Sequence, residues 1–290
     1  VSTVSPTYAE EICRPSDPST GFIGGEGLEG LLQAARDEGR LSGVLNGCFY
    51  DGLAGRRPGW QRIVAMIQGQ LRDWQIDVPA SEAHQLALER VAALPKRRPR
   101  HVITSIGRLV EQKATLLLLG DDTHNSAIER IANRYGRDAA IIILGSGDAA
   151  FEHRMLQVAH RLPNLVFLRG YSEVLADPLY HAGDLFLMPS SFEPCGISQM
   201  LAMRRGQPVV AHRVGGLGDT IDDNETGFLF DGATPDEQAD AFVETTLRAL
   251  DMRANDPLRW QDLQKAAAEK RFDWASAARE TINRLYTSYA

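Results

Sequence analysis

The sequence predicts an α/β fold built on a doubly wound, Rossmann-like parallel sheet. Short apolar runs alternate with helical patterns from residue 101 onward, which is typical of parallel sheets. The run at residues 139–144 is apolar at every position, as expected for a strand buried on both faces. The most informative motifs directly follow such runs, and doubly wound sheets bind ligands at the carboxyl ends of their strands.

Five apolar runs are predicted strands, with helical patterns between most of them. The runs are residues 101–106, 139–144, 165–168, 185–188 and 209–211. Helical spacing is clearest at residues 151–161 and 197–205. We therefore predict one sheet domain over residues 100–272.

The first 99 residues have a helical and irregular pattern. Helical spacing is found at residues 28–40, 61–71 and 81–94, and an Asn-Gly turn ends a short apolar run at Gly47. The basic, proline-flanked segment at residues 95–100 sets the boundary with the sheet domain. The chain starts at Val1 within a strand-like run, which favours truncation or processing at this end.

Composition narrows the class of protein. The chain has 290 residues and a net charge of −7, which argues against nucleic acid or an anionic membrane as the main partner. Its three cysteines are far apart and are expected to be free thiols in a reducing compartment, so we expect a cytoplasmic location. We find no apolar run long enough to span a bilayer and no signal-peptide pattern.

The segment at residues 188–200 is the richest candidate for binding. A predicted strand ends there, a polar loop carries Glu193, and Gly196 opens a helix. Free N–H groups at a helix start favour an anion or a sugar hydroxyl, and glycine lets a ligand approach the backbone. Glu193 is placed to accept hydrogen bonds from hydroxyl groups. The alternative for this residue alone is a structural cap or ion pair within the loop.

Two cations follow the first predicted strand. Arg108 and Lys113 lie five residues apart near a predicted helix start. A planar guanidinium and an ammonium at a strand's carboxyl end suit a diphosphate. An ordinary solvated helix start fits the same spacing.

Other strand ends carry weaker signals. The turn G-S-G-D at residues 145–148 is interpreted as structural, with Asp148 capping a helix. A glycine-rich turn at residues 213–218 is a candidate wall of the same cleft. Tyr171 is placed either to stack on a base or to pack in the core. We find no metal-binding histidine pattern, no nucleophile-elbow motif and no phosphate-binding P-loop, so no metal is expected.

Taken together, the motifs resemble those of the bacterial glycogen synthases and starch synthases, which are retaining glycosyltransferases with the GT-B architecture. Residues 190–199, S-S-F-E-P-C-G-I-S-Q, resemble the family's S-x-F-E-P-C-G-L-T-Q, and residues 107–113 resemble its G-R-L-x-x-Q-K. Residues 5–11, 39–47, 215–217, 226–228 and 272–274 match further motifs in the family's order.

The resemblance implies that residues 100–272 form the C-terminal, nucleotide-sugar-binding domain of that architecture. Residues 1–99 would be the end of the N-terminal domain and an interdomain segment, and residues 273–290 a crossover helix. The expected donor is ADP-glucose, the expected acceptor the non-reducing end of an α-1,4-glucan, and no cofactor or metal is needed. The N-terminal acceptor domain would be mostly missing, so we expect the chain to be inactive alone.

The resemblance also assigns site residues. Arg108 and Lys113 would neutralise the diphosphate, and Glu193 would hold the glucose hydroxyls. The expected donor-binding residues are Asn46, Tyr171, Cys195, Gly196, Ile197, Ser198, Gly215 and Gly216.

Departures from the family pattern keep alternatives open. The family's K-x-G-G-L loop and catalytic-site histidine have no counterpart, and Cys48 follows the L-N-G motif where an aspartate is usual shortly afterwards. The alternatives are a UDP-glucose-dependent transferase of the sucrose or trehalose type and a non-catalytic nucleotide-sugar-binding module. Glucan phosphorylase is disfavoured because residues 193–205 contain no lysine for pyridoxal phosphate.

The last predicted helix has one apolar face. The residues on this face are Trp274, Ala277, Ala278, Ile282, Leu285 and Tyr289. If this helix and the strand at Val1 lack part of their partner, we expect an exposed apolar patch near the two termini.

Overall fold

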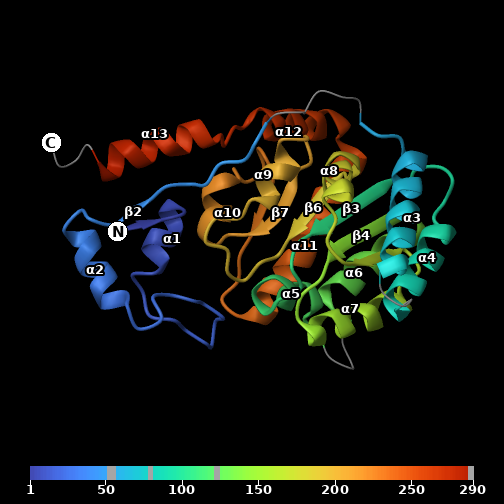
Figure 1. The fold of residues 1–290 in the computed structure, drawn as a ribbon, viewed down its shortest axis with the longest axis horizontal. Helices are drawn as coiled ribbons and strands as arrows, with labels where there is room; N and C mark the ends of the chain where they lie inside the picture. The colour runs from blue at the N-terminus through green and yellow to red at the C-terminus, as the bar shows by residue number, and fades with distance from the viewer. Residues whose placement is uncertain (51–56, 78–80, 121–124, 287–290) are drawn as a thin grey trace.

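The computed structural model describes residues 1–50, 57–77, 81–120 and 125–286. Its centre is a six-stranded sheet flanked by helices, and a small two-stranded sheet lies near the N-terminus (Figure 1). The strands of the large sheet are β3 (His101–Ile106), β4 (Ala139–Gly145), β5 (Leu165–Arg169), β6 (Leu185–Met188), β7 (Val209–His212) and β8 (Phe228–Phe230).

The large sheet is parallel and doubly wound, as predicted. Its strand order is β5-β4-β3-β6-β7-β8, and every neighbouring pair is parallel. The first strand of this sheet, β3, is therefore central. The strands β4 and β5 extend the sheet on one side of β3, and β6, β7 and β8 extend it on the other side. This places the topological switch point between β3 and β6. All five predicted strands are present, whereas the three-residue β8 was not predicted.

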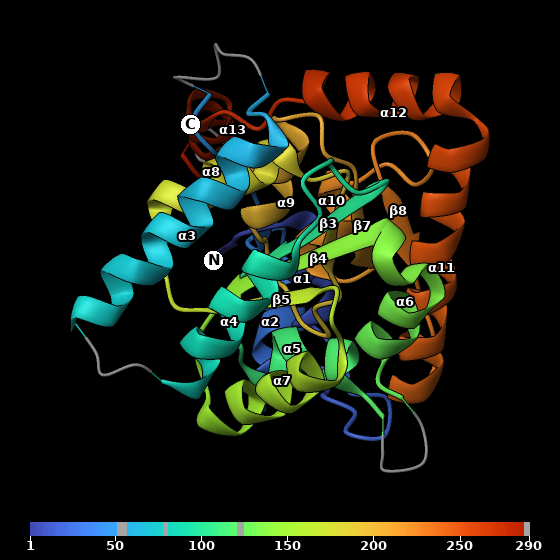
Figure 2. The same cartoon turned by 90° about the vertical axis from the view of Figure 1, so that its right-hand side faces the viewer.

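Helices cover both faces of the sheet (Figure 2). They are α3 (Trp60–Asp77), α4 (Glu82–Ala93), α5 (Glu111–Leu118), α6 (Ala127–Tyr135), α7 (Ala149–Arg161), α8 (Glu173–Ala182), α9 (Ser198–Met203), α10 (Gly215–Thr220), α11 (Pro235–Asn255) and α12 (Pro257–Glu269). A 3₁₀ turn, Gly136–Asp138, precedes β4.

Burial on both faces explains why β4 is apolar throughout. Ile141 and Ile143 pack with the helices α5, α6, α7 and α11, whereas Ile142 and Leu144 pack on the opposite face with α3, α4 and α8. Successive side chains of a strand point to opposite faces, so a strand covered on both sides must be apolar at every position.

Helices α3 and α4 share the core of the large sheet. Ile63 and Ile67 of α3 and Val91 of α4 are buried against Val102 of β3 and Ile142 of β4. The boundary expected at residue 100 stays a prediction, but this packing favours an earlier one. We propose that the sheet unit begins near residue 60.

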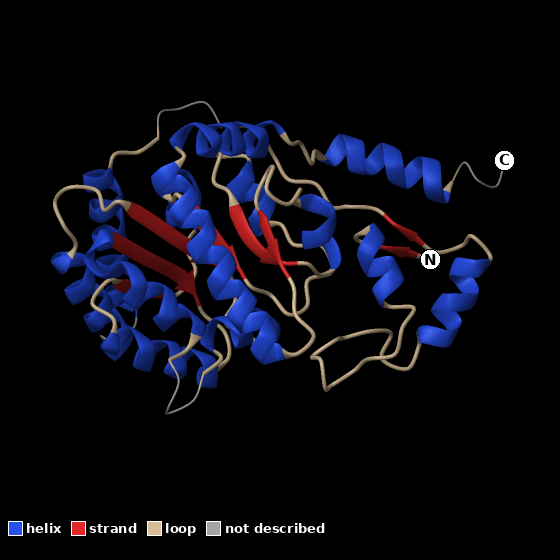
Figure 3. Ribbon diagram, turned by 180° about the vertical axis from the view of Figure 1, so that it is seen from behind, coloured by secondary structure: helices blue, strands red, loops and turns tan. Residues whose placement is uncertain are grey.

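The first fifty residues form a separate small layer. It contains β1 (Ser2–Thr3), α1 (Pro6–Glu11), α2 (Glu29–Asp37) and β2 (Ser42–Gly43), and β1 pairs with β2 in parallel. The last helix, α13 (Trp274–Leu285), runs alongside this layer, and the end of α13 lies at the same end of the molecule as Val1 (Figure 3).

The L-N-G and F-D-W motifs pack against each other. The Cys48 N–H donates to the Phe272 carbonyl at 2.7 Å, and a side chain at Gly47 would lie 2.5 Å from the Trp274 nitrogen. Glycine is therefore required at Gly47 because the start of α13 crosses its backbone.

The expected apolar patch is present on α13. No described residue of this helix is buried, and Trp274 and Ile282 are 42% and 53% exposed. Tyr289 lies outside the described residues. Within the described part of the chain, no helix combines the length and apolar character that crossing a membrane requires.

Candidate functional site

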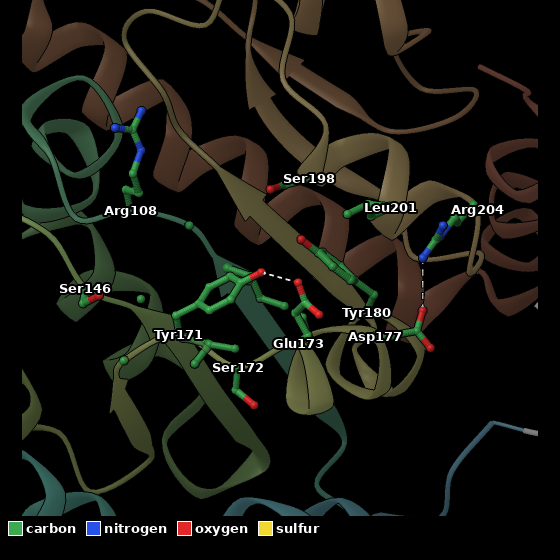
Figure 4. A pocket seen from close by; sticks show the side chains of 16 residues that line it. Arg108, Ser146, Tyr171, Ser172, Glu173, Asp177, Tyr180, Ser198, Leu201 and Arg204 are labelled. Atoms are coloured by element: carbon green, nitrogen blue, oxygen red, sulfur yellow. Dashed lines mark hydrogen bonds and ion pairs between the residues drawn. The ribbon is translucent and has the colours of Figure 1, made fainter. Parts of the chain in front are cut away.

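The main cleft lies over the carboxyl ends of β3, β4 and β5. It has a volume of about 520 Å³, and its polar walls include Arg108, Ser146, Tyr171, Glu173, Ser198 and Arg204. Arg108 lies at one end and Arg204 with Asp177 at the other, with Tyr171 between them (Figure 4). A smaller cavity of about 30 Å³, lined by Arg108, Lys113 and Ser190, follows at the switch point between β3 and β6.

The G-S-G-D turn shapes the floor of the cleft. A side chain at Gly145 would lie 2.1 Å from the Gly107 carbonyl oxygen, and one at Gly147 would lie 2.4 Å from that of Leu109. The Leu109 N–H donates to the Ser146 carbonyl at 3.0 Å, which fastens the two loops together. Asp148 caps α7 through the Ala150 N–H. The predicted Asp148 cap is confirmed, and Gly145 and Ser146 also line the cleft.

Two of the three predicted catalytic residues meet in an ion pair. Lys113 Nζ lies 2.7 Å from Glu193 Oε2, and the side chains are 20% and 9% exposed. The Ser190 hydroxyl donates to the same Glu193 oxygen at 3.1 Å. Burying such a pair is costly unless hydrogen bonds support it, and Ser190 supplies one. Since an ammonium has three N–H donors, Lys113 can hold Glu193 and an anion together.

The third predicted catalytic residue lies at the cleft end beside this pair. Arg108 is exposed, and it forms no ion pair with any residue in the described ranges. Its guanidinium is therefore available to an anion, while Lys113 approaches the same region from α5. The Ser191 N–H donates to the Gln112 carbonyl at 2.8 Å, which joins the loops that carry Lys113 and Glu193.

Tyr171 belongs to the cleft and not to the core. The side chain is 75% exposed, and its hydroxyl donates to Glu173 Oε1 at 2.8 Å (Figure 4). This hydrogen bond raises the pKa of Tyr171. The alternative of core packing is wrong, because the loop after β5 carries the ring over the cleft instead of beneath the sheet.

The far end of the cleft was missed by the sequence analysis. Arg204 forms an ion pair with Asp177 at 3.3 Å, and the buried hydroxyl of Tyr180 has its pKa raised to about 12 by burial. Asp177 and Tyr180 lie on α8 and Arg204 directly follows α9, and none of them belongs to a motif. The spacing of Glu173 and Asp177, four residues apart on one helical face, was the available signal.

The loop at residues 195–199 is stabilised by contacts between its own residues. Gly196 has a φ of +75°, and a side chain there would lie 2.5 Å from Gln199 Oε1. Gln199 Nε2 donates to the Cys195 carbonyl at 2.9 Å. This buried glutamine was not singled out as a site residue, although it ends the most specific motif. Ile197 is exposed, and Ser198 lines the cleft.

Cys195 and Asn46 lie behind the cleft. The Cys195 side chain is buried with Cys48 and Met200, and burial raises the pKa of its thiol to about 11. Asn46 donates its N–H to Cys195 and lines a groove of about 420 Å³ beside α13. Direct contact of these two residues with a donor stays a prediction.

Gly215 and Gly216 support the loop that carries Glu193. The Gly215 N–H donates to Glu11 Oε1 at 2.9 Å, and the Gly216 N–H donates to the Glu193 carbonyl at 3.1 Å. Side chains at these glycines would lie 2.1 Å from the Glu193 carbonyl oxygen and 2.4 Å from the Cys195 backbone. Their amides thus have protein acceptors, which favours a supporting role over the predicted direct contact with a donor.

Among the residues described by the structure, no group of three or more histidine, cysteine or carboxylate side chains could hold a metal ion. The charged groups that line the cleft are two cations and two carboxylates, and hydroxyl groups lie among them. Such a lining suits a ligand with both phosphate and hydroxyl groups.

Comparison of the sequence with known proteins identifies the family to which the chain belongs. Residues 100–250 match the family model described as glycosyl transferases group 1. A glycogen synthase of Hydrogenovibrio crunogenus is 34% identical over 97% of this chain and 55% of its own length. The chain therefore spans about half the length of the curated relatives it matches.

Two solved structures extend the comparison. The catalytic domain of starch synthase IV from Arabidopsis thaliana, bound to ADP and acarbose, is 25% identical with a TM-score of 0.68, over 99% of this chain and 55% of that one. A sucrose-phosphate synthase from Thermosynechococcus elongatus, 19% identical with a TM-score of 0.58 over 100% and 58% of the two chains, shares the fold. The chain belongs to the group 1 glycosyl transferases, and its resemblance to glycogen and starch synthases extends over nearly its full length.

Proposed function

We propose that this chain supplies the donor-binding half of a glucosyl transfer from ADP-glucose to the non-reducing end of an α-1,4-glucan, with retention at the anomeric carbon. The observation that carries this proposal is the convergence of Arg108, Lys113 and Glu193 at the switch point, next to a cleft that Tyr171 overhangs. Two cations, a carboxylate and an exposed aromatic ring match the diphosphate, the sugar and the base of one donor.

The diphosphate would lie between Arg108 and Lys113. The guanidinium offers a planar pair of donors and the ammonium a compact charge. Glu193 would accept hydrogen bonds from the glucose hydroxyls while keeping its bond to Lys113. The amides of Gly196, Ile197 and Ser198 at the start of α9 would meet a phosphate or sugar oxygen.

The base would stack on the exposed ring of Tyr171, since aromatic faces favour offset stacking. Asn46, Cys195, Gly215 and Gly216 would act mainly by holding the surrounding loops in place. This arrangement needs no metal or cofactor to bind the donor.

The chemical step needs charge stabilisation more than a protein base. The bond between glucose C1 and the phosphate oxygen breaks, and a bond from C1 to the acceptor's hydroxyl oxygen forms on the same face. The departing phosphate takes the acceptor's proton. Arg108 and Lys113 would stabilise the negative charge that develops on this leaving group, and fixed positioning would supply much of the remaining rate.

The glucan acceptor is proposed to bind mainly to a region that corresponds to the other half of the relatives. The starch synthase IV catalytic domain is bound to ADP, which supports the adenine donor. The sucrose-phosphate synthase is similar in fold only, so the UDP-glucose alternative has weaker support. A cytoplasmic location fits buried free thiols and belongs to the same proposal.

Hydrogen–deuterium exchange tests where the donor binds. We expect ADP-glucose to slow exchange in the loops at residues 107–113, 145–147, 170–173 and 195–199, and UDP-glucose to do so less. Lys113→Ala should abolish the effect, and Lys265→Ala on the exposed face of α12 should keep it. Protection confined to other parts of the chain, or equal protection in Lys113→Ala, would contradict the proposal.

A further inference from the structure

Helix α1 is fastened to the loops behind the donor site by three polar side chains. The Ser5 hydroxyl donates to the Pro194 carbonyl at 2.6 Å, and the Thr7 hydroxyl donates to Asp219 Oδ1 at 2.7 Å. Glu11 accepts the Gly215 N–H at 2.9 Å. These contacts join segments about 200 residues apart, and all of them reach α10 or the loop that follows Glu193.

Glu11 is the most buried acidic side chain of this contact. It is 7% exposed, and burial raises its pKa against the opposing effects of the Gly215 N–H and Arg14. A carboxylate loses its hydration when it is buried, which is unfavourable in free energy, so a hydrogen bond at this position has to compensate for the loss. The bond to Gly215 is the backbone contact that offsets it.

The contact continues directly to Glu193. Gly215 and Gly216 are neighbours, and while the first N–H is held by Glu11, the second donates to the Glu193 carbonyl at 3.1 Å. The glycine backbone is in van der Waals contact with residues 193–195, where even a Cβ would not fit. A change in the orientation of Gly215 would therefore move the backbone of Glu193.

Arg108 and Tyr171, two of the residues proposed for the nucleotide, lie on other loops than the one held by α1. Arg108 follows β3 and Tyr171 follows β5, and each of these loops is joined to the end of β4. The Leu109 N–H donates to the Ser146 carbonyl at 3.0 Å, and the Gly170 N–H donates to the Gly145 carbonyl at 3.2 Å. Lys113 pairs with Glu193 but is carried by α5, which packs in the core of the large sheet. Loss of the α1 contact should thus affect the residue proposed for the sugar and leave Arg108 and Tyr171, proposed for the nucleotide, in place.

We propose that Glu11 is a positioning residue: through Gly215 and Gly216 it holds Glu193 in the orientation that recognises the glucose of the donor. This proposal rests on the proposed function, in which Glu193 binds the sugar hydroxyls. It assigns to α1 a part in discriminating a nucleotide sugar from the free nucleotide.

The test compares two ligands in four chains. The affinities for ADP-glucose and ADP are measured by calorimetry for the unchanged chain, Glu11→Ala, Glu11→Gln and Glu10→Ala. Glu10 is the matched control, because it lies on the same helix but is exposed and pairs with Arg36. Gln keeps an oxygen that can accept the Gly215 N–H, so it should restore the function lost in Glu11→Ala.

We expect Glu11→Ala to lower the ratio of the ADP-glucose affinity to the ADP affinity by about tenfold, the order of one lost hydrogen bond to a charged group. The ADP affinity should stay within about twofold, and Glu11→Gln and Glu10→Ala should keep the ratio. A general loss of structure would lower both affinities together. If Glu11→Ala does not fold, Glu11→Asp, whose carboxylate is one methylene short, provides the same comparison.

An unchanged ratio in Glu11→Ala or Glu11→Asp, with normal binding of both ligands, would overturn the role of Glu11 and leave the proposed function standing. If the unchanged chain binds neither ligand, the proposed function itself fails and this inference fails with it.

Discussion

The large sheet and the layer formed by residues 1–50 with α13 are stabilised in different ways. In the sheet, strands such as β4 are buried completely on both faces by apolar helices. In the small layer, Leu31 of α2 and Ile282 of α13 are 73% and 53% exposed, and α1 is attached by hydrogen bonds to α10. The sheet is thus held by apolar packing, whereas the layer leaves large apolar side chains exposed and is joined to α10 by hydrogen bonds.

The difference shows that the loop carrying Glu193, which we propose binds the donor, is supported in two different ways. Glu193 follows β6 and is placed by the sheet, but the glycines behind it are fixed by α1. The sheet determines where the carboxyl ends of the strands lie. The small layer fixes the backbone of one loop at that edge through the bond from Gly215 to Glu11. Mutations in the two regions should therefore differ in size and in kind.

The largest expected effect is on the free energy of unfolding in the sheet core. Phe228 is fully buried and stacks with Trp260 at 6.2 Å between ring centroids. Phe228→Ala should lower the free energy of unfolding by about 3–5 kcal/mol because it leaves a cavity. Leu31→Ala on the exposed α2 should change it by less than about 0.5 kcal/mol. Urea unfolding measures both, and equal losses would contradict the comparison.

A smaller loss is expected at the amino ends of the strands. Asp184 is buried and forms ion pairs with Arg57, Arg98 and Arg253 at 3.2, 2.8 and 3.0 Å. Asp184→Ala would leave three guanidinium groups close together without their shared carboxylate. We expect it to lower the free energy of unfolding by about 3 kcal/mol. The exposed partner of Arg130, Asp240, is the control, and Asp240→Ala should cost no more than about 1 kcal/mol.

Urea midpoints and slopes of the two aspartate variants separate these cases. If Asp184→Ala were no worse than Asp240→Ala, charge burial would not contribute to the stability of this edge.

The next effect is a pH dependence that belongs to the sheet region. Burial, with the nearby Arg253, lowers the pKa of His101 from 6.5 to about 4. The unfolded chain then binds more protons than the folded chain between these values. This contribution to stability is present above pH 6.5 and is lost as the pH falls toward 4. The slope from one group is at most about 1.4 kcal/mol per pH unit.

His101→Phe should flatten the rise of the free energy of unfolding with pH in that window. A residual slope is expected because burial also lowers the pKa of His181 and His212. The exposed His153 is the control, and His153→Gln should leave the profile unchanged. Identical profiles for His101→Phe and the unchanged chain would show that His101 is not shielded from protonation.

The smallest effect on stability is expected on α13. Ile282→Ser should change the free energy of unfolding by less than about 0.5 kcal/mol. It should nevertheless reduce the binding of an apolar dye such as anilinonaphthalene sulfonate, because Ile282 and Trp274 line the same exposed groove. Leu258→Ser, on a different helix, removes an apolar side chain that is 73% exposed and lies outside the groove, and it should not change dye binding.

The sequence predicted the large sheet well because its signals are local. Apolar runs bounded by glycine turns mark five strands, and the fully apolar residues 139–144 also indicate their burial on both faces. The strand β8 was missed because three residues are too few to show a period. The helical pattern of residues 28–40 was also correct, but periodicity does not reveal whether a partner covers the apolar face.

The candidate site was predicted in part for the same reason. The motifs that carry Arg108, Lys113 and Glu193 are each contiguous in the sequence, so they could be recognised. In the structure, Lys113 Nζ lies 2.7 Å from Glu193 Oε2. The contact of Glu11 with Gly215 could not be predicted, because 204 residues separate the two. The roles expected for Gly215 and Gly216 rested on a motif, which does not say what the backbone amides contact.

A calorimetric titration of the chain with ADP, with UDP in parallel and Lys113→Ala as the variant, tests the central claim most directly. The account predicts that ADP binds more tightly than UDP and that Lys113→Ala weakens ADP binding, while Lys265→Ala leaves it unchanged. Binding of neither nucleotide, or ADP binding that is equal in Lys113→Ala, would contradict the assignment of a donor site to this cleft.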